Sequence, residues 1–215
     1  MPPATSKGVG MARWMLAAAF VLGLAGCGAS LPKPDEIAPT APAGLALPLK
    51  ARVMLFVAQA DLERKLAYDV NLVSVEVTDI KEGEALAQAA QALLAKAFAT
   101  VATNQPSIRP QVVARVTGKA VWDRKESTFR INCEIFATDA GGGLIGRYFD
   151  IYRSPSVLSL ESSLAPAFGQ CLKRPLDEFL RSPGLAELAR AGFPEPVPAV
   201  GNAYLRSQGF VIPGQ

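Results

Sequence analysis

Three consecutive runs between Gln111 and Arg153 alternate apolar and polar residues, and this period of two constrains the fold more than any other feature. Successive side chains of a β-strand point to opposite faces, so the alternation gives each run one apolar and one polar face. The apolar face of the first run consists of Val112, Ala114, Val116, Gly118, Ala120 and Trp122. That of the second run consists of Phe129, Ile131, Cys133, Ile135 and Ala137. Turn-forming residues at 123–126 and 139–143 separate the runs, which predicts a three-stranded antiparallel meander with one buried face.

Other segments have the pattern of regular secondary structure. Apolar and β-branched runs at 53–58 and 70–78 predict two more strands. Apolar residues at helical spacing predict a helix over 84–103, with Glu82 and Glu84 at the end that favours negative charge. A second helix is expected at about 160–181, with Pro166 tolerated in its first turn and a kink or division at Pro175. The run GLAELARAG, from residue 184, predicts a short helix.

This order of elements predicts an α+β fold. We expect a two-layer sandwich in which two main helices cover one face of a mostly antiparallel sheet of about five strands. The predicted domain spans residues 50–182, and residues 183–215 form a tail rich in proline and glycine. The end of that tail carries large apolar residues, including Phe193, Tyr204 and Phe210. The tail is therefore expected to lie over the domain or to dock on a partner.

The first 26 residues differ in character from the rest. Lys7 and Arg13 are their only charged residues, and an apolar run of 11 residues extends from Trp14 to Leu24. Such a run suits the core of a secretory signal and is too short to cross about 30 Å of hydrocarbon as a helix. The sequence Leu24-Ala25-Gly26-Cys27 resembles the lipobox of bacterial lipoproteins. The alternative interpretation is a buried N-terminal helix with a chance cysteine.

The resemblance implies a lipid anchor. In lipoproteins the cysteine receives a diacylglycerol thioether, the preceding bond is cleaved, and the new amine is usually acylated, for example with palmitate. Residues 1–26 would then be the signal peptide, Cys27 the lipidated residue, and 27–49, with five prolines, a tether. Several acyl chains anchor a protein stably at about 0.8 kcal/mol per buried methylene, without a transmembrane helix. Gly28, where an aspartate would favour the inner membrane, implies the periplasmic face of the outer membrane.

Charge and composition exclude several classes of function. The first 26 residues hold two of the 22 basic residues and none of the 19 acidic ones, so the remainder has 20 against 19. A nearly neutral chain argues against a nucleic-acid partner. The sequence contains no histidine, which excludes Ser-His-Asp and Cys-His catalysis and the usual histidine-bearing metal sites. We therefore expect no catalytic residue, no cofactor and no metal.

Two groups of residues are candidates for a catalytic or ligand-binding site. The carboxylates Asp61, Glu63, Asp69, Glu134 and Asp150 are candidates for acid–base chemistry if they converge, although solvated surface charge is the simpler interpretation. The aromatic residues Trp122, Tyr148 and Tyr152 are candidates for a ligand platform, against the simpler interpretation of core or rim packing. The glycines at 141–143 lack the Lys-Ser/Thr of a phosphate-binding loop and predict a hairpin turn.

The cysteines that remain after lipidation are Cys133 and Cys171. Both lie on apolar stripes, Cys133 on the middle meander strand and Cys171 on the second helix. If that helix packs on that strand face, the two sulfurs approach each other, and export to an oxidising compartment favours a disulfide. The alternative is two separate buried thiols that act as small apolar side chains.

The domain itself has a limited resemblance to small periplasmic lipoproteins. The segment Val116-Thr117-Gly118 through Asp139-Ala140-Gly141 to Ile145 is similar to the strand, hairpin and D-x-x-G turn of the lipopolysaccharide-translocon plug and of auxiliary lipoproteins of ABC-type lipid transport. The resemblance implies a non-catalytic lipoprotein, anchored by its acyl chains, that binds a protein partner in an envelope assembly or transport complex. The alternative function is binding of a lipid or other small apolar ligand. A large apolar cavity would favour that alternative, and a filled core would favour the protein partner.

Overall fold

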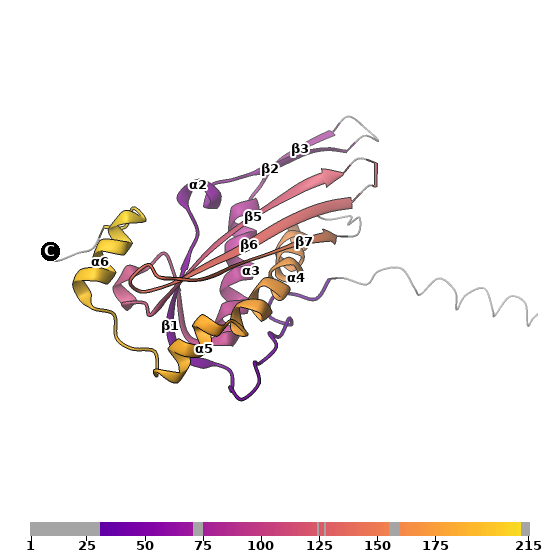
Figure 1. The fold of residues 1–215 in the computed structure, drawn as a ribbon. Coiled ribbons are helices and arrows are strands. Elements are labelled where there is room, and N and C mark those ends of the chain that lie inside the picture. Colours follow the sequence, from indigo (N-terminus) through magenta and orange to yellow (C-terminus); the bar gives the residue numbers. More distant parts are fainter. Residues whose placement is uncertain (1–30, 71–74, 124, 127, 155–159, 212–215) are drawn as a thin grey trace, which may run out of the picture. The chain divides into compact units, whose positions relative to one another are not determined.

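A five-stranded sheet in the order β4-β1-β5-β6-β7 organises the computed structural model, which describes residues 31–70, 75–123, 125–126, 128–154 and 160–211 (Figure 1). Its strands are β1 (Leu49–Phe56), β4 (Phe98–Thr103), β5 (Val112–Asp123), β6 (Thr128–Asp139) and β7 (Leu144–Ser154). β5, β6 and β7 form the predicted antiparallel meander. β1 runs parallel to both of its neighbours, β4 and β5, so the sheet is mixed rather than mostly antiparallel.

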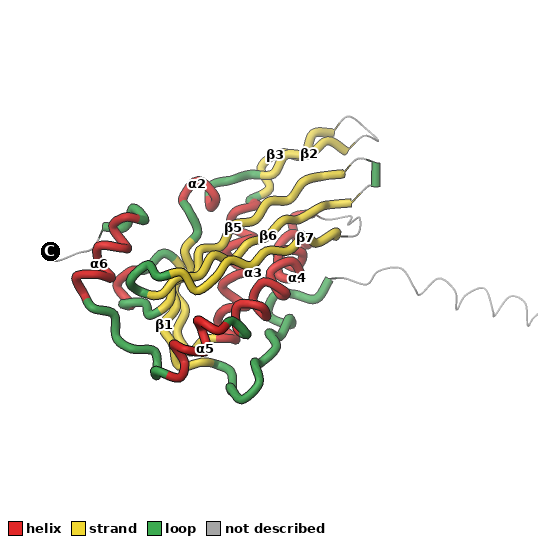
Figure 2. Tube along the Cα trace, viewed as in Figure 1, coloured by secondary structure: helices red, strands yellow, loops and turns green. Residues whose placement is uncertain are grey.

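Two long helices cover one face of this sheet, as predicted. They are α3 (Glu82–Ala97) and α4 (Leu160–Leu180), which lie side by side against the meander (Figure 2). The residues predicted for the apolar face of the meander, from Val112 to Ala120 and from Phe129 to Ala137, are buried beneath them. Most of the largest fully buried side chains lie at this interface between the helices and the sheet. Each fully buried leucine or phenylalanine contributes about 1.5–3 kcal/mol, so the interface is the main source of apolar stabilisation of the domain. The α+β class and the helix layer are thus confirmed.

The helix expected over 84–103 is shorter, and its second part is a strand. α3 ends at Ala97, and the following residues form β4, whose backbone is already extended at Phe98. The sequence of β4, FATVAT, contains Phe98 and Val101 at helical spacing from Leu94, so it satisfies the helical template as well as a strand pattern. Pairing with β1 decides in favour of the strand, because the parallel ladder supplies hydrogen-bond partners for the backbone of β4, and its β-branched residues also favour a strand.

The strand expected over 70–78 is two strands. β2 (Leu66–Val70) and β3 (Val75–Ile80) pair antiparallel in a separate two-stranded sheet, so the chain reverses within the predicted run. A continuous β-branched pattern does not reveal such a reversal. A four-residue helix, α2 (Gln59–Leu62), joins β1 to this hairpin.

α4 is one continuous helix through both of its prolines, so Pro175 does not divide it. Because α4 begins at Leu160, Pro166 lies beyond the first turn. Pro175 removes the backbone donor to the carbonyl of Cys171. The helix is held instead by its packing, because Cys171, Leu172 and Phe179 are almost completely buried.

The domain extends beyond both predicted limits. Residues from Pro32 onward belong to one compact unit. Ile37 is buried, Lys96 of α3 donates to the carbonyl of Ile37, and Thr40 donates to Asp177 of α4. The segment expected as a free tether is therefore packed on the helix layer from about residue 32, because its prolines and Ile37 find an apolar surface there.

The C-terminal tail contains more structure than expected. The predicted short helix is α5 (Pro183–Arg190), and a further helix, α6 (Pro198–Ser207), follows it. Leu205 of α6 packs on Met54 and Val113, on the side of the sheet opposite α3 and α4. The expectation that the tail lies over the domain is confirmed for residues 193–210.

Candidate functional site

The side of the meander opposite the helices is largely uncovered, and we call it the outer face. It carries the residues that alternate with the buried ones, and the strand register aligns them in rows across β5, β6 and β7. One row is Thr117, Glu134 and Phe149, and the next is Lys119, Asn132 and Ile151. These rows line an open hollow of about 870 Å³. The outer face consists of Val113, Arg115, Thr117, Lys119, Val121, Asp123, Thr128, Arg130, Asn132, Glu134, Phe136, Thr138, Arg147, Phe149, Ile151 and Arg153.

Positive charge dominates the outer face, with five cations and two anions, Asp123 and Glu134, among its residues. Asp123 lies at the turn after β5, where it accepts hydrogen bonds from the backbone of Lys125 and Glu126. Glu134 accepts two hydrogen bonds from Arg147, from Nε at 2.7 Å and from Nη2 at 2.8 Å. This hydrogen bonding and the charge of Glu134 raise the pKa of Arg147. Within the part of the chain that the structure describes, no ion-pair partner is found for Lys119 or Arg130. The face is thus a cationic surface with free charge at its centre.

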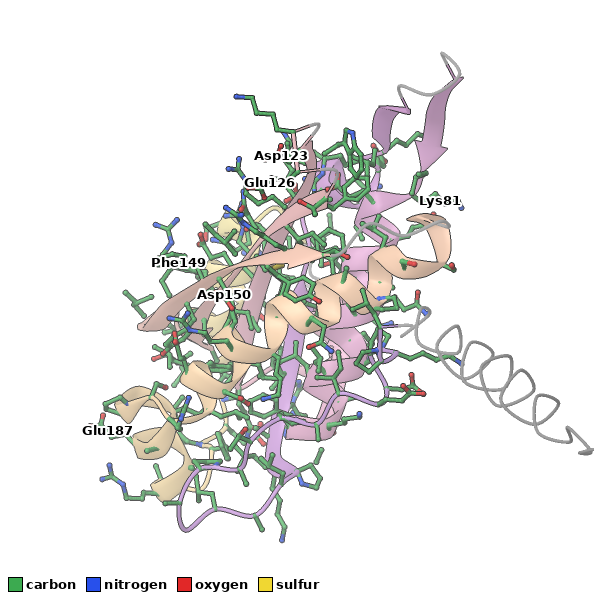
Figure 3. All side chains as sticks on the ribbon, turned by 90° about the vertical axis from the view of Figure 1, so that its right-hand side faces the viewer. Lys81, Asp123, Glu126, Phe149, Asp150 and Glu187 are labelled. Carbon is green, nitrogen blue, oxygen red and sulfur yellow. A yellow bond between two sulfur atoms is a disulfide. The ribbon has the colours of Figure 1, made fainter. Side chains whose placement is uncertain are left out.

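Large apolar side chains lie among these cations. Phe149 is 67% exposed and Ile151 is 55% exposed, and both project from β7. Figure 3 shows Phe149 on the opposite side of β7 from α4. Isolated exposed apolar residues are common, but two neighbours on a cationic face form a surface suited to an amphipathic partner.

An ionic cluster of Arg64, Asp61 and Glu82, which we call the Arg64 cluster, borders the hollow along β5. β1 ends opposite Arg115, and beyond that point Glu82 accepts a hydrogen bond from the backbone N–H of Ala120. Arg64 donates to the carbonyl of Gly118, to Glu82 at 2.7 Å and to Asp61 at 2.6 Å. Side chains thus replace the missing neighbour strand, and the exposed fraction of the Glu82 side chain is only 2%.

α6 covers the far end of the outer face, beside the turn between β6 and β7. The hydroxyl groups of Tyr204 and Thr138 are 2.8 Å apart and hydrogen bonded. Within the turn, Asp139 accepts hydrogen bonds from the backbone of Gly141 and Gly143, which confirms the prediction of a glycine hairpin turn. The uncovered part of the face therefore lies between α6 and the Arg64 cluster.

The structure joins Cys133 to Cys171 by a disulfide, which confirms that prediction. Their Cα atoms are 6.0 Å apart, within the range that a disulfide spans. Cys133 lies on β6 opposite Gly118 of β5, and Cys171 is completely buried on α4. The bond ties the helix layer to the centre of the meander. Cys27, the predicted lipidation site, lies outside the described residues.

Three of the candidate carboxylates, Asp61, Glu134 and Asp150, line the hollow. Each is paired with an arginine, Asp61 with Arg64, Glu134 with Arg147 and Asp150, at 3.5 Å, with Arg174. Glu63 accepts a hydrogen bond from Gln59. The side chain of Asp69 is outside the described residues. Among the residues that are described, no three cysteine, aspartate or glutamate side chains are grouped as a metal site.

The candidate aromatic platform is not assembled either. The ring of Trp122 lies 4.7 Å from that of Phe129, and the ring of Tyr148 lies 5.8 Å from that of Phe179 in α4. Tyr152 is partly buried, and this burial raises the pKa of its hydroxyl. All three project to the helix side of the sheet, where they take part in packing, and not to the outer face.

The cationic outer face was not singled out by the sequence-based reasoning. Its signal is present, because the polar positions of the three alternating runs hold five cations and two anions. The sequence does not show that α3 and α4 leave this side open, or that α6 covers only its end.

Comparison with known proteins adds little. No protein-family model and no curated protein sequence matches the chain. Among solved structures, a Xanthomonas campestris protein of family DUF330 is 12% identical, with a TM-score of 0.38, and the match covers 73% of this chain and 94% of that one. Two PelC dodecamers from Paraburkholderia phytofirmans are 12% and 13% identical, with TM-scores of 0.36 and 0.39. These matches cover 62% and 64% of this chain and 94% of each PelC chain. Likeness at this level carries no functional inference.

Proposed function

We propose that the chain is a non-catalytic lipoprotein, anchored through Cys27 to the periplasmic face of the outer membrane, that binds a protein partner in an envelope assembly or transport complex. The anchoring rests on the basic residues, apolar run and lipobox at 1–27. Among the described residues, no helix is both long and apolar enough to cross a membrane.

The observation that carries the partner-binding proposal is the filled interior combined with an open outer face. The space found between α3, α4 and the sheet measures about 10 Å³ and is lined by apolar side chains such as Leu93, Val116 and Leu172. A dry space of that size holds no more than a single water, and a lipid needs several hundred Å³. Storage of an apolar ligand there is disfavoured, whereas exposed Phe149 and Ile151 favour a surface contact.

The anchor is tested by replacing Cys27 with serine in the full chain. Without the thiol no thioether can form, so the variant is expected to remain unprocessed or to become soluble. Membrane fractionation and mass spectrometry of the N-terminal peptide measure both properties. Ser30→Ala, which leaves the lipobox intact, is the matched control. Outer-membrane fractionation of Cys27→Ser, with no lipid on the wild-type peptide, would refute the anchor.

Partner binding is tested by solubilising membranes and recovering the wild-type chain through a tag placed after Gln215. A stoichiometric envelope protein is expected in the wild-type sample and is expected to be lost when exposed Phe149 and Ile151 are both changed to serine. Both residues are on the surface, so the thermal melt of this variant should match that of the wild type. Recovery of the chain alone would contradict the proposal.

A further inference from the structure

The outer face carries an excess of positive charge, whereas the chain after residue 26 is nearly neutral. Downstream of residue 26, basic and acidic residues are almost equal in number, at 20 and 19. The outer face nevertheless has five cations and two anions. Positive charge is therefore concentrated on one side of the domain, and this asymmetry gives the surface a preferred sign of partner.

Two of these cations are close neighbours for which no paired anion is found within the described ranges of the chain. Lys119 lies opposite Asn132, and Arg130 lies opposite Val121, so Lys119 and Arg130 are diagonal neighbours on the same face. Side chains in this relation can reach each other. Like charges at such spacing repel, and an anion placed between them removes the repulsion. Glu126, the carboxylate near this end of the face, is already paired with Arg153, the neighbour of Arg130.

We propose that the outer face is the docking surface for an acidic protein segment, whose carboxylates pair with Lys119 and Arg130 and whose apolar side chains cover Phe149 and Ile151. This inference rests on the proposed function and specifies the chemistry of the partner. The open hollow of about 870 Å³ between Arg64 and Phe149 has room for a segment of several residues.

The position of the N-terminal segment favours a protein over the membrane surface as the occupant. Residues from Pro32 to Thr40 lie against α3 and α4, where Lys96 donates to Ile37 and Asp177 accepts from Thr40. This part of the chain, the first that the structure describes, therefore lies on the helix side of the domain, whereas the outer face is on the opposite side of the sheet.

The experiment uses the full acylated chain, reconstituted in phosphatidylcholine nanodiscs without free detergent, and three probes. The first is a short synthetic peptide of glutamate, serine and leucine, the second is the same peptide with lysine in place of glutamate, and the third is a phosphatidylcholine vesicle containing phosphatidylglycerol. The variant is Lys119→Glu with Arg130→Glu. The matched control, Lys33→Glu with Arg190→Glu, reverses two exposed charges away from the outer face.

The wild type is expected to bind the acidic peptide more tightly than the basic one, with an affinity that falls as salt increases. The outer-face reversal should weaken that binding by about tenfold or more, since like charges then oppose each other, and the control reversal should not. Equal binding of both peptides, or equal loss in both variants, would overturn the proposal. Binding to the vesicles that depends on Lys119 and Arg130, without peptide binding, would reassign the surface to anionic lipid and overturn it as well.

The same variants separate this inference from the proposed function. In membranes, the outer-face reversal should remain acylated and membrane-bound but lose the co-purifying partner. A partner recovered equally with the outer-face reversal would overturn the docking surface and leave the proposed function standing. Recovery of no partner with the wild type would instead refute the proposed function.

Discussion

Glu82 is a buried charged residue that lies where β5 has no neighbouring strand to accept its backbone hydrogen bonds. It pairs with Arg64 at 2.7 Å and accepts the N–H of Ala120, where β5 has lost its neighbour β1. Loss of one member of a buried pair leaves the other uncompensated, which commonly costs about 3–5 kcal/mol. The cluster therefore fixes the start of α3 to the edge of β5, and sequence reasoning identified Glu82 only as a favourable charge near a helix N-terminus.

Glu82→Ala is expected to lower the free energy of unfolding by about 2–3 kcal/mol, because it leaves the N–H of Ala120 without its acceptor and removes one of the two carboxylates that pair with Arg64. Glu84→Ala is the matched control. Glu84 is in the same helical turn but pairs with Lys81 on the surface, at 62% and 65% exposure, so its loss should cost less than about 1 kcal/mol. Urea unfolding measures both values. Equal losses in the two variants would contradict the structural role of the buried cluster.

The disulfide connects residues 38 positions apart and joins α4 to β6. In the chain-entropy model, closure of a loop of this length stabilises the fold by roughly 4 kcal/mol. The double substitution Cys133→Ala with Cys171→Ala should therefore lower the melting temperature strongly, and reductant should lower that of the wild type alone. Thiol titration of the unfolded, unreduced protein provides a direct check, since detection of both thiols would rule out the bond.

At the scale of elements, α6 is an accessory to the sheet. Its contact is the cluster of Leu205, Met54 and Val113, which is separate from the core beneath α3 and α4. Deletion of residues 201–215 should leave the far-UV circular dichroism of the remaining domain largely unchanged, yet lower stability by about 2 kcal/mol as Met54 and Val113 become exposed. Weaker partner recovery is expected as well, because α6 borders the outer face.

Point substitutions separate packing from simple chain length in that experiment. Leu205→Ala should reproduce most of the loss in stability, about 2–3 kcal/mol, whereas Val211→Ala should be neutral because Val211 is 86% exposed. A Leu205→Ala variant as stable as the wild type would show that α6 is not held by this cluster.

The elements that could be predicted are those whose pattern allows a single interpretation. β5 and β6 alternate over 12 residues each, so both their type and their buried face follow from the sequence. β4 could not be predicted, because Phe98 and Val101 also continue the stripe of α3 and only pairing with β1 distinguishes the two. α6 was missed because its sequence, PAVGNAYLRS, contains proline, glycine and asparagine, which are poor helix formers, and because tertiary contacts through Leu205 stabilise it.

For the whole molecule, the sequence indicated the chemistry of the site more readily than its shape. The absence of histidine can be read directly from the sequence. The charges at the polar positions of the meander can be read there as well, and the cationic character of the outer face follows from these charges. The open hollow depends on long-range packing, namely Arg64 on one side and α6 on the other, and no local pattern encodes it. The same limitation applies to residues 32–48, whose prolines suggest a tether but which pack on α3 and α4.

Asp177 holds this N-terminal segment on the helix layer. Its carboxylate accepts hydrogen bonds from the backbone and hydroxyl of Thr40, at 2.7 and 3.0 Å, and from Lys173 at 2.7 Å. Burial acts to raise the pKa of Asp177, but the hydrogen bonds from Lys173 and Thr40 outweigh it, and the pKa is lowered. A carboxyl whose pKa is lower in the folded than in the unfolded state stabilises the fold above its unfolded pKa. That contribution is lost as the pH falls through the folded value.

Asp177→Asn is therefore expected to cost about 2 kcal/mol at neutral pH, where the wild-type carboxylate is ionised, and progressively less as the pH falls below the usual range of aspartate. Release of the segment should also make the chain near Lys33 more sensitive to trypsin, without loss of the core helices. Glu178→Gln is the matched control, because Glu178 pairs with Arg174 on the more exposed side of the same helix. If the difference between wild type and Asp177→Asn stays constant from neutral to acid pH, the carboxylate is not what fastens residues 32–40 to α4.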